Sequence, residues 1–215
     1  MNAMRVGGIV LCGGQSKRMG RPKAWLPFAG ELMLPRVVRL LRTSVEPVAV
    51  VAAPEQDLPE LPSDVLVIRD EEKGRGPLQG LSAGFHALKG RCDAAYASSC
   101  DVPFLNPAFV RRMIDLLDAY HICVPHVEGF HHPLAAVYRL EVVDAVDGLL
   151  AENRLRPVFL FDAVPTRIVA ADELRDVDPQ LKTLRNLNTP EDYEAALRDW
   201  ESSGPRSAPK TSRRG

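Results

Sequence analysis

The chain alternates short apolar runs with amphipathic segments as far as residue 120, and this alternation constrains the fold more than any other feature. Apolar runs of strand length lie at 5–11, 48–52, 65–68 and 94–98. Hydrophobic residues at helical spacing follow Pro35 and Leu81, and Asn106-Pro107 begins a third helix with the face Phe109, Met113, Leu116, Leu117 and Tyr120. This order predicts a Rossmann-like α/β fold, in which helices flank a mostly parallel sheet and ligands bind at the carboxyl ends of strands.

The second half of the chain is less regular. Residues 122–124 are typical of a strand, and residues 127–138, which contain Gly129 and Pro133, favour a hairpin or a bulged strand. Helices are expected at 141–151 and 157–163, and Thr189-Pro190 begins a last helix that runs to Trp200. We therefore expect a single domain over residues 1–200, followed by a disordered basic tail over 201–215.

Composition excludes several classes of protein. The 215 residues are 46% hydrophobic and 26% charged, with no apolar run long enough to span a membrane and no basic and apolar leader of the export type. The four cysteines form no C-x-x-C pair, so we expect reduced thiols and a cytoplasmic location. A net charge of −1 disfavours binding to nucleic acid.

A glycine-rich, basic loop directly follows the first predicted strand. It reads LCGGQSKRMGRPK, and residues 1–30 hold five basic side chains and no acidic one. Gly13 and Gly14 let the backbone approach a ligand and offer N–H groups to an anion, while the lysines and arginines supply positive charge for phosphate. The pattern is neither a Walker A motif nor G-x-G-x-x-G. The alternative is a glycine turn with a solvated basic loop.

Two acidic residues follow two other predicted strands. Asp101 lies in SSCDVPF, where a carboxylate at a strand end suits a hard metal ion, although it could also cap a turn. Asp70 begins the glycine-rich loop expected over 70–78, which would approach a base or ribose or would be an ordinary surface loop. Together, the three strand ends predict a site for a magnesium nucleotide.

Five segments taken in order, LCGGQSKRMGRPK, RD…GPLQG, CDVP, HPLAAVY and NLNTPEDY, resemble the molybdenum cofactor guanylyltransferase family over about residues 5–200. The basic glycine loop is shared by many nucleotidyltransferases, whereas GPLQG, CDVP and NLNTP narrow the assignment. The resemblance implies a nucleotide-diphospho-sugar-transferase-like fold. It also implies an enzyme that joins GMP from magnesium GTP to the phosphate of molybdenum-bearing molybdopterin and releases pyrophosphate.

The same resemblance implies the roles of individual residues. The catalytic residues would be Lys23, Arg18 and Asp101, and Asp101 would also bind Mg²⁺. The residues that contact the nucleotide would be Leu11, Cys12, Gly13, Gly14, Lys23, Asp70 and Asp101. The residues on the molybdopterin side of the site would be Arg18, Asn186 and Asn188. The implied partners are GTP, the molybdopterin cofactor, and molybdoenzyme apoproteins or their chaperones.

Two positions depart from the family pattern. Cys12 stands where alanine is usual, which is a small change. After the second strand the chain reads Val51-Ala-Ala-Pro-Glu55, where relatives carry an asparagine, so one proposed base contact is missing. The alternatives to a guanylyltransferase are a related transferase that uses CTP or a sugar phosphate, or a non-catalytic carrier of the cofactor. A sugar-phosphate enzyme would normally need a longer second domain, for which 215 residues leave little room.

Other reactive residues favour structural roles. His126, His131 and His132 lack an established zinc spacing. Cys100 is expected to be a buried thiol, because the sequence shows no histidine arranged to activate it and this chemistry needs no covalent intermediate. Arg154 and Arg156 are expected at a solvated helix end, although they could also reach an anionic phosphate.

Overall fold

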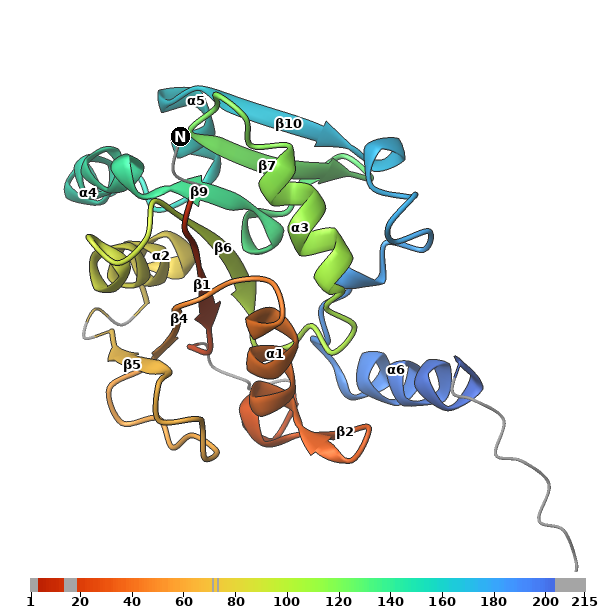
Figure 1. The fold of residues 1–215 in the computed structure, drawn as a ribbon. Coiled ribbons are helices and arrows are strands. Elements are labelled where there is room, and N and C mark those ends of the chain that lie inside the picture. Colours follow the sequence, from red (N-terminus) through yellow and green to blue (C-terminus); the bar gives the residue numbers. More distant parts are fainter. Residues whose placement is uncertain (1–3, 14–18, 71, 73, 204–215) are drawn as a thin grey trace, which may run out of the picture.

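A computed structural model describes residues 4–13, 19–70, 72 and 74–203. In this part of the chain, the main sheet has the strand order β10-β7-β9-β6-β1-β4-β5, and β8 pairs with β7 alone (Figure 1). The strands of this sheet are β1 (Val6–Leu11), β4 (Val48–Ala52), β5 (Leu66–Arg69), β6 (Ala94–Ser99), β7 (Ile122–Val127), β8 (Phe130–His131), β9 (Val137–Arg139) and β10 (Thr166–Ala170). A separate two-stranded hairpin is formed by β2 (Pro27–Phe28) and β3 (Glu31–Leu32).

The sheet is mostly parallel, as the alternation of strands and helices predicts. Strand β1 lies in the interior of the sheet and pairs in parallel with β4 and β6, while β5 pairs in parallel with β4. The short β9 is antiparallel to both of its neighbours, β6 and β7. Since β6 and β7 therefore run in the same direction, most strands end at one edge of the sheet, which is where ligands bind in this class of fold.

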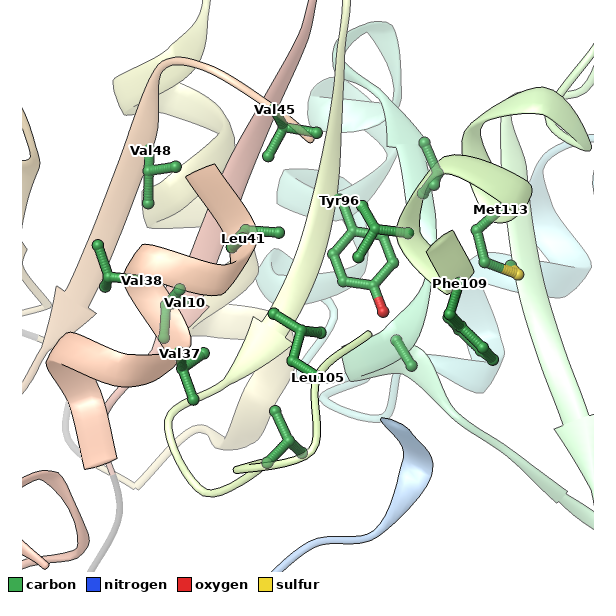
Figure 2. Packing of buried hydrophobic residues seen from close by; sticks show 14 of the residues in the cluster. Val10, Val37, Val38, Leu41, Val45, Val48, Tyr96, Leu105, Phe109 and Met113 are labelled. Atoms are coloured by element: carbon green, nitrogen blue, oxygen red, sulfur yellow. The ribbon is translucent and has the colours of Figure 1, made fainter. Parts of the chain in front are cut away.

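Helices bury both faces of the sheet. One face is covered by α1 (Met33–Arg42) and α3 (Pro107–Asp115), which pack on strand residues such as Val10 and Tyr96 (Figure 2). The other face is covered by α2 (Gly76–Leu88), α4 (Val143–Ala151) and α5 (Val158–Ala163). A last helix, α6 (Pro190–Ser203), packs beside the β2–β3 hairpin in a smaller cluster that contains Phe28 and Leu187. None of the helices described is long and apolar enough to cross a membrane.

Several boundaries differ from those expected. Helix α2 begins at Gly76, inside the predicted loop 70–78, because Pro77 fits the first turn of a helix, and the φ of 74° that Gly76 adopts turns the chain into it. Helix α3 ends at Asp115, so Leu116 and Tyr120 lie beyond it and Tyr120 is 41% exposed. Strand β10 was not predicted, and α6 continues to Ser203, three residues past the expected end of the domain. The rest of the predicted tail, 204–215, lies outside the described residues.

The close approach of α2 to β1 depends on Gly84. A Cβ atom at this position would lie 2.8 Å from Ile9 Cδ1, and Ile9 is fully buried. We expect Gly84→Ala to lower the free energy of unfolding, because overpacking costs about 1–3 kcal/mol, more than the roughly 1 kcal/mol that alanine gains over glycine in a helix.

The matched control is Gly148→Ala in α4, where an added Cβ would meet no atom within 4 Å. This variant should be more stable than the parent by up to about 1 kcal/mol. Urea unfolding of the two variants measures both values. Equal changes in the free energy of unfolding, with the same sign in both variants, would contradict the close packing assigned to Gly84.

Candidate active site

The carboxyl ends of β1, β4, β5 and β6 border one cleft of about 1170 Å³. The first residues after these strands are Cys12, Ala53, Asp70 and Cys100, and all four line it. The Cys100 N–H donates to the Leu11 carbonyl at 3.0 Å, which continues the sheet ladder one residue past the strand. A second hollow, of about 450 Å³, lies at the opposite end of the sheet and contains none of the predicted site residues.

The basic glycine loop contributes one wall of the cleft. Leu11, Cys12 and Gly13 line it, as do Arg21 and Lys23 on the far side of the loop. Two predicted residues of this loop, Gly14 and Arg18, lie outside the described residues. The described part of the loop thus brings backbone and two cationic side chains to the strand ends.

Asp101 and Lys23 form an ion pair in the floor of the cleft. Lys23, in the short 3-10 turn η1 (Lys23–Trp25), places its Nζ 2.6 Å from Asp101 Oδ2. Both side chains are largely buried, with exposed fractions of 18% for Lys23 and 9% for Asp101. The other carboxylate oxygen, Oδ1, accepts hydrogen bonds from Ser99 Oγ at 2.6 Å and from Asn186 Nδ2 at 2.9 Å. Every oxygen of this carboxylate therefore has a protein partner.

The two asparagines of the NLN motif contact this ion pair. Asn186 also donates to Ser99 Oγ at 3.0 Å, and the Asn188 side-chain carbonyl accepts from Lys23 Nζ at 2.9 Å. Leu187 between them is fully buried, and its N–H donates to the Asp101 carbonyl at 3.0 Å. Since side chains two apart in an extended segment point the same way, both amides meet the cleft floor while Leu187 anchors the segment in the core.

The first turn of α6 holds the asparagine segment in place. The Asp192 carboxylate accepts from the N–H groups of Asn188 at 3.1 Å and Thr189 at 3.0 Å, and the Thr189 hydroxyl accepts from the Asp192 N–H at 3.2 Å. The two backbone N–H groups hold the pKa of Asp192 below its usual value. This reciprocal cap was predicted in part, because the sequence marks Thr189 as the start of the helix.

Arg36 ties the turn after Asp101 to the end of α6. Its Nε donates to the Pro103 carbonyl at 2.9 Å, and its guanidinium lies 4.5 Å from the centre of the Trp200 ring. The Tyr193 hydroxyl also donates to the Pro27 carbonyl in the β2–β3 hairpin. The C-terminal helix is therefore part of the scaffold that positions the asparagines.

Cys12 and Cys100 lie side by side where β1 and β6 meet the cleft. They follow the register pair Leu11 and Ser99 on adjacent strands, and both belong to the cluster that packs under α1. A hydrogen bond with the Cys12 thiol, together with burial, raises the pKa of Cys100 well above its usual value. A thiol held in its protonated form is a poor nucleophile, in agreement with the structural role expected for Cys100.

A side chain that the sequence analysis missed lies on the β4–β5 side of the cleft. Gln56 lines it, donating from Nε2 to the Cys12 carbonyl at 3.0 Å and accepting at Oε1 from the Ala53 N–H at 3.3 Å. Asp70 lines the same side. Gln56 lies three positions beyond Ala53, where no sequence motif locates it.

The remaining candidates lie apart from the cleft floor. The rings of His126 and His131 are 4.7 Å apart in the β7–β8 hairpin, and neither lines the cleft. Arg154 stacks over Phe159 at 4.5 Å and, like Arg156, is exposed to solvent outside the cleft.

The described residues contain no group of three or more histidine, cysteine or acidic side chains placed to hold a metal ion. Asp101 is the buried carboxylate of the cleft. A single carboxylate suits Mg²⁺, which commonly binds through one or two carboxylates, substrate phosphates and several waters. The donor set therefore fits a divalent cation shared with a bound nucleotide.

Residues 8–166 match the family described as MobA-like NTP transferase domain. A Mycobacterium avium protein named "Probable molybdenum cofactor guanylyltransferase" is 35% identical over 200 residues, which cover 90% of this chain and 96% of that protein. A Mycobacterium tuberculosis protein of the same name is 37% identical over 189 residues, which cover 85% and 88%.

Solved structures share the fold. Molybdopterin-guanine dinucleotide biosynthesis protein A from Archaeoglobus fulgidus has a TM-score of 0.75 at 19% identity and covers 91% of this chain and 99% of its own. A Mycobacterium tuberculosis protein solved with manganese has a TM-score of 0.61 at 18% identity, with coverage of 90% and 98%. At these identities the likeness shows the fold alone.

The cap formed by Asp192 gives a test of how the asparagine segment is held. We expect Asp192→Ala to lower the free energy of unfolding by about 1 kcal/mol at neutral pH, as loss of a helix cap does. Because the folded-state pKa is depressed, the carboxylate stabilises the fold above its usual pKa of 3.8, and this contribution is lost as pH falls through the lower folded value. Urea unfolding as a function of pH should show the two proteins converge in acid.

Glu191→Ala is the control, since Glu191 shares the first turn but makes no side-chain hydrogen bond among the described residues. Its effect should be smaller than that of Asp192→Ala. A difference between parent and Asp192→Ala that does not change with pH would contradict the role of the charged cap.

Proposed function

The chain belongs to the MobA-like NTP transferase family, and we propose that it transfers GMP from GTP to the phosphate of molybdenum-bearing molybdopterin. The products are molybdopterin guanine dinucleotide and pyrophosphate. The curated relatives bear the name of this activity at 35% and 37% identity over most of the chain, which supports a nucleotidyltransferase of this kind.

One observation carries the proposal. The Lys23–Asp101 pair, with its 2.6 Å contact, lies at the floor of a cleft bordered by four strand ends, between the glycine loop and the Asn186–Asn188 segment. A cationic side chain and a carboxylate at the same point are what phosphoryl chemistry needs, namely one group for the phosphates and one for a divalent cation. The manganese bound by a protein of the same fold also supports a divalent cation.

The transfer needs little from the protein beyond positioning and charge. An oxygen of the acceptor phosphate attacks the α-phosphorus of GTP, and the bond from that phosphorus to the pyrophosphate oxygen breaks. The acceptor phosphate is mostly ionised at neutral pH, because its second pKa is about 6, so no general base is required. Lys23 would bind the triphosphate, and the Gly13 backbone would approach it. Mg²⁺ held by Asp101 would supply neutralisation of the phosphate charge.

The two ends of the cleft would separate the two substrates. Asp70 and Gln56 lie on the β4–β5 side, and we assign them to the nucleoside. Leu134 and Asn186 line the β6 side, and we assign this side to molybdopterin together with Asn188 and Arg18. The cytoplasmic location and the apoprotein or chaperone partners stay predictions.

The direct test is turnover with defined substrates. The purified chain, molybdopterin, Mg²⁺ and GTP labelled at the α-phosphate should release pyrophosphate and yield a labelled dinucleotide. Parallel reactions use CTP, ATP or UTP, and a sugar 1-phosphate as acceptor. Preferred transfer from CTP or to the sugar phosphate would replace the proposed reaction, and binding without pyrophosphate release would indicate a carrier.

Asp101→Asn should leave the fold intact but reduce turnover by about 10²–10³-fold, the effect of removing one preorganised electrostatic contact. Ser98→Ala provides the control, because Ser98 is buried in the same strand and its hydroxyl donates to the Ser99 carbonyl at 3.3 Å rather than to the carboxylate. Turnover of Asp101→Asn equal to that of the parent at saturating GTP and Mg²⁺ would remove Asp101 from the mechanism.

Substitutions of Lys23 and Gln56 should affect phosphate binding and base selection separately. Lys23→Ala should weaken the binding of GTP and CTP by the same factor, because a phosphate contact carries no information about the base. Gln56→Ala should instead narrow the difference between the binding affinities for GTP and for CTP. Calorimetric titration of both nucleotides measures these values. A changed base preference in Lys23→Ala with unchanged overall affinity would show that the two roles are assigned to the wrong residues.

A further inference from the structure

The two oxygens of the Asp101 carboxylate have partners of different kinds. Oδ1 is bound by Ser99 and Asn186, whereas Oδ2 is bound by Lys23 alone among the described residues. Ser99 is a short side chain at the last position of β6, is 7% exposed and is paired in register with β1. Asn186 precedes the buried Leu187, whose N–H is bonded to the Asp101 carbonyl. Oδ1 is therefore held by a buried serine and by an exposed asparagine whose neighbour is anchored in the core.

Oδ2 is held by a group that can leave. Lys23, which lines the cleft, reaches it at the end of a flexible four-carbon stem, from the first residue of a 3-10 turn. The only other acceptor of its Nζ in the described structure is the side-chain carbonyl of Asn188 at 2.9 Å. Bound phosphate oxygens would offer this ammonium stronger, charged acceptors.

An ammonium and a divalent cation compete for Oδ2, because two positive charges a few ångströms apart repel strongly in a partly buried site. We propose that Lys23 occupies Oδ2 of Asp101 in the free protein and exchanges it for a divalent cation when a nucleoside triphosphate draws the lysine away, with Ser99 as the positioning residue that holds Oδ1 throughout. This inference rests on the proposed function for the identity of the nucleotide, but the exchange itself involves only groups of this chain and the cation.

The exchange predicts opposite changes in cation affinity when Lys23 and Ser99 are substituted. Removing the lysine that binds phosphate should strengthen cation binding to the empty protein, even though it weakens the nucleotide site. Removing the Ser99 hydroxyl should weaken cation binding although Ser99 does not touch the cation. Ser99 would thus act on affinity for the cation by fixing the orientation of the carboxylate, as residues behind metal ligands commonly do.

The first experiment titrates Mn²⁺ into the full chain without nucleotide and follows free Mn²⁺ by electron paramagnetic resonance. Lys23→Met, which keeps most of the side-chain stem, should bind Mn²⁺ about tenfold or more tightly than the parent. Arg21→Met is the matched control, because Arg21 lines the same cleft and loses the same charge but has no contact with Asp101. Equal effects of the two substitutions, or no effect of Lys23→Met, would overturn the exchange.

The second experiment tests Ser99 in the Lys23→Met protein, where cation binding is measurable without nucleotide. Adding Ser99→Ala should weaken Mn²⁺ binding by about 10–100-fold, whereas adding Ser98→Ala should change it little. Melting temperatures of all variants distinguish loss of the fold from loss of the site. Equal loss from both serine substitutions would overturn the positioning role.

A final titration with GTP and with CTP separates the exchange from the proposed function. In the parent protein, either bound triphosphate should raise the affinity for Mn²⁺ above that of the nucleotide-free protein. Tight binding with CTP but not with GTP would support the exchange and contradict guanine transfer. No enhancement by either nucleotide, in a protein that binds them, would overturn the exchange.

Discussion

The carboxylate of Asp101 joins segments that are far apart in the sequence. It binds Lys23, which lies 78 residues earlier, and Asn186, which lies 85 residues later, while Ser99 comes from the same strand end. Burying this charge is tolerable only because each oxygen has a hydrogen-bond donor and one donor is a cation. The glycine loop, the end of β6 and the start of α6 therefore depend on one another for their positions. The cleft is assembled around this group rather than merely lined by it.

The parallel sheet brings these segments together. A strand buried on both faces, such as β1 with Val10 on one side and Ile9 on the other, requires helices on both sides. Parallel strands all end at the same edge of the sheet, so the loops that follow β1, β4, β5 and β6 meet there. The sequence alone predicted this part of the account, because apolar runs, helical periodicity and strand-end glycines and acids are all local signals. The motifs then placed Lys23, Asp70 and Asp101 at one edge.

The parts that were not predicted depend on non-local pairing. The orientation of β9 is decided by its neighbours β6 and β7, and β10 alternates too weakly to be identified without its partner strand. Gln56 reaches the cleft through a bond to the Cys12 carbonyl that no sequence spacing specifies. The asparagines were expected on the molybdopterin side. Their contacts with Lys23 and Asp101 follow from the burial of Leu187, whose partners lie in other elements. Ser99 was missed for the same reason, since a serine at a strand end gives no signal of its own.

By the proposed exchange, Asp101 Oδ2 binds the lysine in the free protein and the cation in the loaded one. A crystal structure of the protein with Mn²⁺ and a GTP analogue that carries a methylene group between the α- and β-phosphorus atoms tests it most directly, because this analogue cannot transfer its nucleotide. An anomalous manganese peak is expected at coordination distance from Asp101 Oδ2, with Lys23 Nζ on the phosphates and Ser99 still bonded to Oδ1. Manganese bound elsewhere, with the Lys23–Asp101 pair intact, would contradict it.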